Sequence, residues 1–322
     1  MKHVYPTYYQ AFRCIAADCP DSCCQGWDVV IDSDTETFYN SVQGKFGEKL
    51  RGAIYTDQDG DRVFRLAEEK KCPFWGEDRL CDIYRELGEE HLCLTCAQFP
   101  RLKMDYTVFC EHTLALACPE AARLILSTDR AYEDFAEDIE EDCEDYDAQV
   151  MRRLLKIRKK CAELLTADQP LKGRLEELLS YVSQAQRELT GFEIGYFPPS
   201  LREIMEECEY IDEGNRELFA LAAEDQANDT RFEKELTRLA LYYLYRYFLG
   251  AIDGYDIVAV ARFLIGSVQV IGNLEERCGD IVTAAQLYSK EIEQSYENME
   301  LLMRSSKLGV RSEKLTVDCV HT

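Results

Sequence analysis

Ten of the fifteen cysteines in this chain of 322 residues lie within its first 118 positions. They are Cys14, Cys19, Cys23, Cys24, Cys72, Cys81, Cys93, Cys96, Cys110 and Cys118. Packing of a hydrophobic core does not require such a concentration of sulfur, whereas binding of a soft or borderline metal does. Thiolate-rich sites hold zinc or iron–sulfur clusters, while magnesium and calcium prefer oxygen ligands. The pattern therefore predicts a metal or cluster site in the first third of the chain.

Disulfide bonds are another use for many cysteines, because small secreted domains are often stabilised in this way. Three features argue against them here. The first ten residues, MKHVYPTYYQ, contain no apolar stretch of an export signal. A chain of this length can bury a core without covalent links, and the adjacent residues Cys23 and Cys24 are difficult to bridge to each other. A metal site is favoured over disulfides and over simple buried thiols.

The cysteine spacing does not decide between zinc and an iron–sulfur cluster. Cys93 and Cys96 form a C-x2-C pair, which is typical of zinc ribbons, but the chain contains only one such pair. The opening run C-x4-C-x3-C-C, from Cys14 to Cys24, matches neither the zinc-finger spacings nor the bacterial ferredoxin run. Both metals stay open at this point.

Histidines could complete such a site, because a neutral imidazole is a common zinc ligand. His91 and His112 each lie two residues from a cysteine. His3 and His321 lie near the ends of the sequence and are expected to be solvated.

The charge is strongly negative, with 61 acidic and 37 basic residues and a net charge of −24. Such a field repels nucleic acid and anionic lipid and attracts a cationic partner, such as a lysine-rich protein surface. Eleven acidic residues lie between Asp129 and Asp147, and six basic residues follow between Arg152 and Lys160. This segment is interpreted as solvated helices or a linker, with a cation-steering edge as the alternative.

No apolar stretch reaches the roughly 18 residues that a membrane-spanning helix needs. The longest candidate, Leu239 to Ile252, is interrupted by Arg246 and is interpreted as a buried helix. The protein is expected to be cytoplasmic, with no membrane or nucleic-acid partner.

The sequence predicts a mainly α protein in two parts. Residues 1–125 form a small, irregular α+β cysteine-rich module, with a strand at WDVVID (Trp27–Asp32), a helix cap at Ser33 or Asp34, and a turn at DQDGD before RVFRL. Residues 126–322 form a helical bundle on which this module packs. Helices are expected near 120–140, 149–166, 171–190, 230–250, 255–275 and 280–304, with breaks at Gln169-Pro170, at Phe197-Pro198-Pro199 and at Gly250 to Gly254.

Several catalytic motifs are missing. The sequence contains no dinucleotide-binding G-x-G-x-x-G, no P-loop, no G-x-S-x-G and no H-E-x-x-H. A group of tyrosines, Tyr242, Tyr243, Tyr245 and Tyr247, is interpreted as core packing, with an aromatic pocket for a methylated amine as the alternative.

The cysteine motifs resemble a known family. FRC, SCCQGW, KCPFW, LCDIYRELG, TCAQFPR and LACPEAARLIL are similar to the CxxCxxCC zinc- or iron-chelating module, and their order resembles the flagellin lysine N-methylases. LYYLYRYFLGAIDGYDI extends the expected similarity over nearly the whole chain. The family's cysteine pattern falls on Cys14, Cys19, Cys23, Cys24, Cys72, Cys81, Cys96 and Cys118, called the eight-cysteine set below. Cys93 and Cys110 lie outside it.

The resemblance implies methyl transfer from S-adenosylmethionine to lysines of flagellin or another protein, with a cysteine-bound iron–sulfur cluster of the 4Fe-4S type. Zinc is the alternative metal. Arg101 is a candidate partner for the cofactor carboxylate, and Trp27 for covering the adenine or the cluster, with an ion pair and core packing as their structural alternatives. The C-x3-C-x2-C motif of radical adenosylmethionine enzymes is absent. A zinc-stabilised adaptor and an iron–sulfur redox protein are the rival functions.

Overall fold

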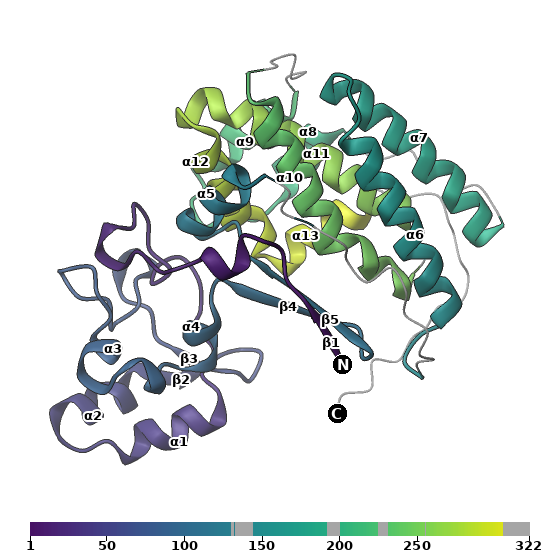
Figure 1. Cartoon of the computed structure of the whole chain (residues 1–322). Helices are drawn as coiled ribbons and strands as arrows, with labels where there is room; N and C mark the ends of the chain where they lie inside the picture. The colour runs from purple at the N-terminus through teal and green to yellow at the C-terminus, as the bar shows by residue number, and fades with distance from the viewer. Residues whose placement is uncertain (130–131, 133–143, 192–199, 225–230, 255, 305–322) are drawn as a thin grey trace. The chain divides into compact units, whose positions relative to one another are not determined.

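The structure is a computed structural model, and it describes residues 1–129, 132, 144–191, 200–224, 231–254 and 256–304 (Figure 1). The chain divides into two units. The first comprises residues 1–135 and 282–294, and the second comprises residues 136–281 and 295–322. Most of the acidic segment between Asp129 and Asp147, the Phe197-Pro198-Pro199 break and His321 lie outside the described residues.

The first unit combines short helices with two small sheets. Its helices are α1 (Ser33–Ser41), α2 (Gly44–Ala53), α3 (Asp82–Leu87), α4 (Leu94–Gln98) and α5 (Pro119–Ser127). Strands β2 (Ile54–Thr56) and β3 (Arg62–Phe64) form the hairpin predicted around DQDGD. A second sheet has the order β1-β5-β4, from β1 (Lys2–Val4), β4 (Arg101–Asp105) and β5 (Phe109–Leu114). This sheet was not predicted from the sequence.

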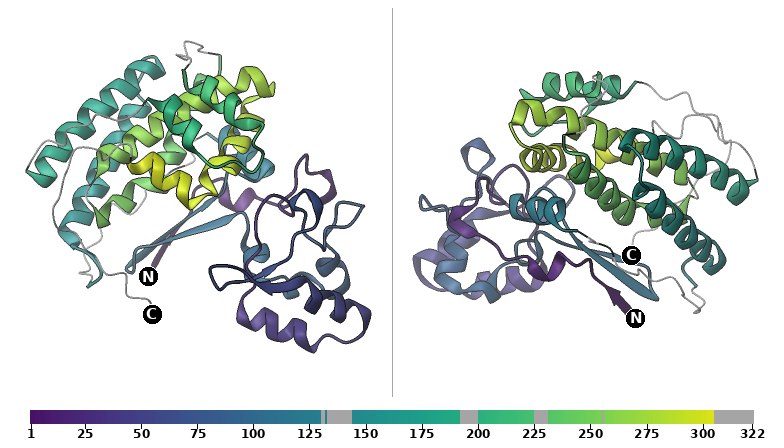
Figure 2. Two further views of the ribbon diagram at one scale, coloured as in Figure 1. Left: turned by 180° about the vertical axis from the view of Figure 1, so that it is seen from behind. Right: turned by 45° about the horizontal axis from the view of Figure 1, so that its top comes forward.

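The second unit is helical, as predicted. It contains α6 (Ala148–Leu165), α7 (Leu171–Thr190), α8 (Leu201–Glu207), α9 (Asn215–Glu224), α10 (Glu233–Tyr247), α11 (Ile257–Cys278) and α13 (Tyr296–Arg304). Helices α6 and α7 lie side by side (Figure 2). A small strand-containing N-terminal region followed by a helical bundle confirms the predicted fold class. Helices α8 and α9 were not predicted.

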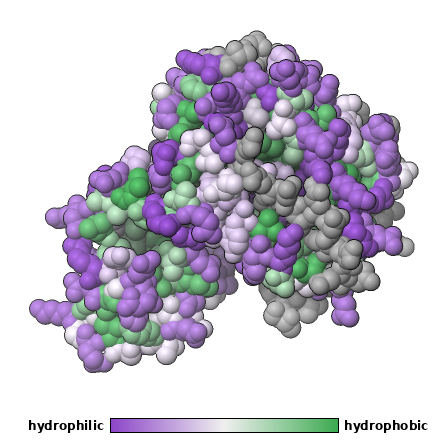
Figure 3. All heavy atoms as spheres, viewed as in Figure 1, coloured by the Kyte–Doolittle hydropathy of each residue, from purple (hydrophilic) through white to green (hydrophobic). Residues whose placement is uncertain are grey.

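Helix α11 is long and apolar enough to cross a membrane by length and composition, with a mean hydropathy of 1.7. In the structure 72% of its apolar window is buried, which is typical of a core helix in a bundle. It is more apolar than the predicted segment Leu239–Ile252, which forms the end of α10 and the 3-10 helix η5 (Phe248–Asp253). Hydrophilic residues dominate the face shown in Figure 3, with hydrophobic residues scattered among them.

Two predicted features of the first unit are corrected. Trp27–Asp32 is not a strand, because its pairing with β3 is limited to a single bridge between Val30 and Val63. Two hydrogen bonds flank this bridge, from Ile31 N to the Arg62 carbonyl (2.7 Å) and from Phe64 N to the Val29 carbonyl (3.2 Å). The cap of α1 is Asp32, one residue before the predicted cap, because its carboxylate accepts the N–H of Thr35 (2.9 Å).

The segment 280–304 was predicted as one helix of the bundle, but it is divided. Helix α12 (Ile281–Tyr288) continues into a π-helical turn, η6 (Ser289–Glu293), and α13 starts at Tyr296. The predicted domain boundary assigned all of this segment to the helical part. In the structure residues 282–294 belong to the first unit, where polar side chains of this segment bind the cysteine-rich loops.

Replacing Asp32 with alanine is expected to lower the free energy of unfolding at neutral pH by about 1–2 kcal/mol, because the carboxylate caps α1 and also accepts the N–H of Leu94 (2.8 Å). The N–H groups of Leu94 and Thr35 hold the pKa of Asp32 below its usual value. A lowered folded-state pKa gives stability that is present above the unfolded pKa, about 3.9, and is lost as the pH falls through the folded pKa.

Urea unfolding of both proteins at pH 7 and at acidic pH checks this prediction, since the difference should narrow at low pH. Asp34→Ala is the matched control, because Asp34 lies in the first turn of the same helix but does not cap it. An equal loss in both variants would mean that charge near the helix terminus, rather than the cap, stabilises α1.

Candidate metal and cluster site

The residues of the eight-cysteine set all lie in the first unit, on loops and at helix ends. Cys14 and Cys19 flank the 3-10 helix η2 (Ala16–Asp18), Cys23 and Cys24 lie in the following loop, Cys72 precedes the Trp75 bridge, Cys81 precedes α3, Cys96 lies in α4, and Cys118 precedes α5. Each carries a free thiol in the structure. Loops and helix ends leave backbone N–H groups near the sulfur atoms, which favours thiolates.

Hydrogen bonds tie these loops to one another. The N–H of Cys72 donates to the carbonyl of Cys24 (2.8 Å), so the first cysteine loop lies against the segment that follows η3 (Glu68–Lys70). The guanidinium of Arg79 donates to the carbonyl of Cys19. These bonds hold backbone segments about 50 to 60 positions apart in the sequence next to each other.

The sulfur atoms interact electrostatically as one group. Cys23 and Cys24 share a thiol–thiol hydrogen bond. Further electrostatic interactions join Cys19 to Cys14, Cys23 and Cys118, both Cys23 and Cys24 to Cys72 and Cys81, Cys23 to Cys118, Cys96 to Cys24 and Cys72, and Cys72 to Cys81. Distant stretches of the first third of the chain therefore bring their thiols into one region. Cys23 and Cys24 each interact with thiols of three other segments, so the first cysteine loop is at the centre of this group.

Ionisation of several of these thiols together is unfavourable. Burial raises the pKa of Cys72 to about 12, and the charges of Cys81 and Cys93 act in the same direction. Partial burial raises the pKa of Cys118 to about 12. The hydrogen bond from Cys24 lowers the pKa of Cys23 to about 7. Because like charges repel and burial disfavours charge, a set of thiolates here requires a cation among them.

The separation of the sulfur atoms bears on the kind of centre that they fit. Four thiolates around one zinc ion lie about 3.8 Å apart, given Zn–S bonds of about 2.3 Å. Among the described residues, no three sulfur atoms of the eight-cysteine set lie within 4.8 Å of one another. In an iron–sulfur cluster each thiolate binds its own iron, so the ligands stand farther apart. The described thiols of this set are therefore not placed as a closed four-sulfur zinc site would place them.

Arg101 and Trp27, the two predicted cofactor-binding residues, have different surroundings. Arg101 begins β4, is exposed, and places its guanidinium 5.2 Å from the ring centroid of Phe12. The Trp27 indole donates to the carbonyl of Cys23 (3.0 Å), and its ring packs edge-on against Phe99 at 4.8 Å. Trp27 thus links the first cysteine loop to the end of α4.

His91 and Cys93 lie near this site and make packing and hydrogen-bond contacts there. The ring of His91 stacks on Phe38 at 4.0 Å, and its carbonyl accepts the hydroxyl of Tyr39 (2.8 Å). Cys93 is buried and hydrogen-bonds to Cys96, which keeps both members of the C-x2-C pair together. Cys110 and His112 lie elsewhere in the first unit, on β5 beside His3.

Sequence reasoning missed a polar contact at the first cysteine loop. Asp21 lies between Cys19 and Cys23, and its carboxylate pairs with Lys290 (2.7 Å). Gln286 donates to the same carboxylate (2.7 Å) and to the carbonyl of Ala117 (3.1 Å). Lys290 also favours the thiolate of Cys23. No local sequence signal joins Asp21 to a residue 269 positions away, so only the fold reveals this contact.

The tyrosine group on α10 is core packing, as interpreted from the sequence. Tyr242 and Tyr243 are fully buried, and Tyr243 and Tyr247 both pack edge-on against Phe263 of α11.

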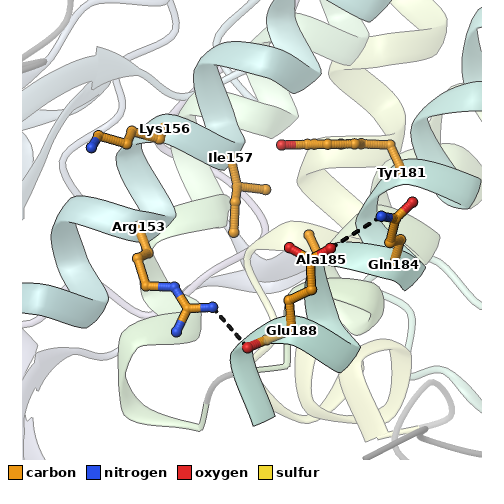
Figure 4. A pocket seen from close by; sticks show the side chains of 7 residues that line it. All are labelled: Arg153, Lys156, Ile157, Tyr181, Gln184, Ala185 and Glu188. Atoms are coloured by element: carbon orange, nitrogen blue, oxygen red, sulfur yellow. Dashed lines mark hydrogen bonds between the residues drawn. The ribbon is translucent and has the colours of Figure 1, made fainter. Parts of the chain in front are cut away.

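A separate pocket in the second unit lies between α6 and α7. Figure 4 shows Arg153 donating to the carbonyl of Glu188 (2.8 Å) at its edge. None of the predicted site residues lines this pocket.

Comparison with known proteins supports the predicted resemblance. The chain is 29% identical to the flagellar biosynthetic protein FliU of Salmonella muenchen over 135 residues, which is 38% of this chain and 75% of FliU. It is 28% identical to a lysine-N-methylase of Salmonella typhimurium and 30% identical to one of Salmonella choleraesuis, in each case over 32% of the methylase. The chain resembles the flagellin lysine methylases.

The similarity to these relatives covers less of the chain than its motifs indicated. The expected similarity covered nearly the whole chain, whereas each of these matches covers 38% of it. The chain matches about a third of the length of the two lysine methylases. No protein-family model and no solved structure matches the chain.

Proposed function

We propose that this chain is a cytoplasmic protein-lysine N-methylase that modifies flagellin, with S-adenosylmethionine as methyl donor and an iron–sulfur centre held by the eight-cysteine set. The similarity to the two curated lysine methylases carries the proposal. The convergence of thiols in the first unit supports the cysteine-bound centre. Free thiols at all described cysteines fit a reducing compartment.

The chemistry of methyl transfer sets requirements for the site. A lysine ammonium has no lone pair, and its pKa in solution is about 10.4, so it must lose a proton before it attacks a sulfonium methyl group. Burial of the amine lowers its pKa, and a carboxylate nearby can accept the proton. With 61 acidic residues in the chain, carboxylates are abundant. Alignment of amine, methyl group and sulfur then supplies much of the acceleration.

Two residues of this chain have proposed roles in holding the methyl donor. The exposed guanidinium of Arg101 lies five positions after Cys96 and can bind the donor's carboxylate in a bidentate contact. The indole of Trp27 donates to the carbonyl of Cys23 and so lies beside the first cysteine loop, where it can cover the adenine of the donor or the cluster. When bound, an iron–sulfur cluster with one iron free of protein ligands offers a further site for the amino and carboxylate groups of the donor.

Methyl transfer to flagellin tests the proposal directly. Anaerobically purified chain is incubated with methyl-labelled S-adenosylmethionine and flagellin, after its iron, sulfide and zinc have been quantified. Label on flagellin lysines is the expected result. Iron and sulfide without methyl transfer would favour the redox protein, and zinc without iron would favour the adaptor. Either result overturns the proposal.

Methylation is expected to slow as ionic strength rises. A protein with a net charge of −24 attracts a lysine-bearing surface over a distance of about 10 Å in 0.1 M salt, and this attraction is screened at higher salt. Initial rates of methylation at subsaturating flagellin check the prediction. They are measured from about 50 mM to about 500 mM salt, a range over which electrostatic screening changes strongly. A short neutral lysine peptide is the control, because its rate should change less. Equal salt dependence of both substrates would exclude electrostatic attraction as the cause.

A further inference from the structure

We infer that His3, Cys110 and His112 form a second metal site, which binds a divalent cation of the zinc class. None of the three belongs to the eight-cysteine set, so the inference does not depend on the proposed function. Their ligand atoms all lie within 4.8 Å of one another. Among the described residues, this is the one group of three or more histidine, cysteine or acidic side chains that meets this condition.

The register of the sheet assembles the three ligands. Cys110 and His112 are two positions apart on β5, and alternate residues of a strand point to the same face. Strand β1 pairs in parallel with β5, and this register places His3 beside Cys110. A shift by one residue would turn Cys110 and His112 to the opposite face. The site therefore rests on fixed backbone pairing.

The distances between the ligand atoms are close to those of a tetrahedral site. Nδ1 of His3 lies 2.9 Å from Nε2 of His112, and Sγ of Cys110 lies 3.4 Å from the same nitrogen. Around zinc, bonds of about 2.0–2.1 Å to nitrogen and 2.3 Å to sulfur place such atoms about 3.3 Å and 3.6 Å apart. The three side chains need to move apart by only a few tenths of an ångström to accommodate a zinc ion. The cation would replace the proton shared by the two histidine nitrogens.

The donor chemistry selects the class of metal. Two imidazoles and one thiolate suit zinc and similar borderline cations, whereas magnesium and calcium prefer oxygen. Three protein ligands leave a fourth coordination position, as in zinc sites that bind water or a substrate. Cys110 is fully buried, His112 is half-buried and His3 is exposed, so a cation can reach the site from the side of His3.

Neighbouring residues support this arrangement. The ring of Tyr5 stacks on His112 at 4.3 Å, which restrains the orientation of the imidazole. Asp105 lies opposite Cys110 in the adjacent strand, and Lys103 lies opposite His112, so both side chains share the face of the ligands. Lys103 and Asp105 form an ion pair (2.7 Å) whose charges offset each other, so Lys103 does not act there as an isolated positive charge.

Metal binding to the full-length chain without a histidine tag tests the inference. Wild type and His3→Gln are titrated anaerobically with Co²⁺ and then with Zn²⁺ against a chromophoric chelator. We expect His3→Gln to bind one equivalent of metal less, or to bind that equivalent more than about 100-fold more weakly. Loss of a metal ligand should weaken binding at least as much as loss of a residue that only orients a ligand, which costs about 10- to 100-fold in affinity. The cobalt–thiolate charge-transfer absorption of that equivalent should be lost as well. His3 is exposed, so this variant is expected to fold.

Two comparisons make the result specific. His91→Gln removes a histidine of the same unit that stacks on Phe38 and lies outside the site, so it should keep the wild-type stoichiometry. Cys24→Ser, in the eight-cysteine set, should keep the equivalent that His3→Gln loses. Equal zinc stoichiometry and affinity in wild type and His3→Gln would overturn the inference. Binding only at millimolar metal would also overturn it, because the contacts would then be hydrogen bonds alone.

Discussion

Replacing Cys24 with serine is expected to remove the cysteine-bound centre, so that bound iron and sulfide fall to background. Cys24 interacts with Cys23, Cys72, Cys81 and Cys96, and so links the first cysteine loop to the other segments. A serine hydroxyl is nearly isosteric with the thiol but is a poor ligand for a soft metal. The substitution should therefore remove the centre while leaving the fold of the second unit unchanged.

Metal analysis of the anaerobically purified variant, together with its circular dichroism, measures this effect. Cys278→Ser is the matched control, because Cys278 ends α11 in the second unit and should have no influence on iron content. Full iron and sulfide in Cys24→Ser would exclude this residue as a ligand. Loss of zinc in place of iron would show that the thiols hold zinc.

A second pair of variants separates the two members of the C-x2-C motif. The family pattern includes Cys96 and omits Cys93, whereas the structure shows the two thiols hydrogen-bonded to each other. We expect Cys96→Ser to lose the centre and Cys93→Ser to retain it. Retention by both variants would remove this motif from the ligand set.

The regular helices could be predicted from the sequence, because their apolar residues recur at helical spacing and their ends carry clear signals. Helices α6 and α7 begin and end within one residue of the predicted ranges, and Pro170 separates them as expected. Helices α8 and α9 were missed because both are short. The interruption at η6 was missed because a π-helical turn preserves much of the apolar pattern.

The small sheet could not be predicted, because its strands carry little local information. Strand β1 has only three residues, and its partner β5 lies more than 100 positions away. His3 was expected to be solvated because it lies near the start of the sequence. It is exposed, but pairing with β5 places its imidazole against His112. Long-range pairing, and not local pattern, brings His3, Cys110 and His112 together.

The cysteine spacing identified the module but not its neighbours. The thiols recur in short motifs that are visible in the sequence, whereas Asp21 and Lys290 are ordinary charged residues without a motif. Their ion pair depends on the return of residues 282–294 to the first unit. A domain boundary drawn from composition alone does not reveal such a return.

Phe74→Ala is expected to destabilise the first unit by about 3–5 kcal/mol, the usual cost of truncating a buried phenylalanine. The side chain is fully buried. Its ring packs edge-on against Phe64 at 4.9 Å and Phe46 at 6.0 Å, and the ammonium of Lys49 lies 5.0 Å from its centroid. Because Phe74 follows Cys72 by two positions in the same core, a cavity here should also loosen the loops that carry the thiols.

Two measurements are needed, since metal binding and folding are coupled at such sites. Equilibrium urea unfolding gives the loss of stability, and the rate of metal loss to a chelator gives the effect on the centre. Phe219→Ala is the control: Phe219 is equally buried and packs against Tyr210 in the second unit, so it should cost similar stability without accelerating metal loss. If both variants released metal at the wild-type rate, the core around Phe74 would not be what holds the cysteine loops in place.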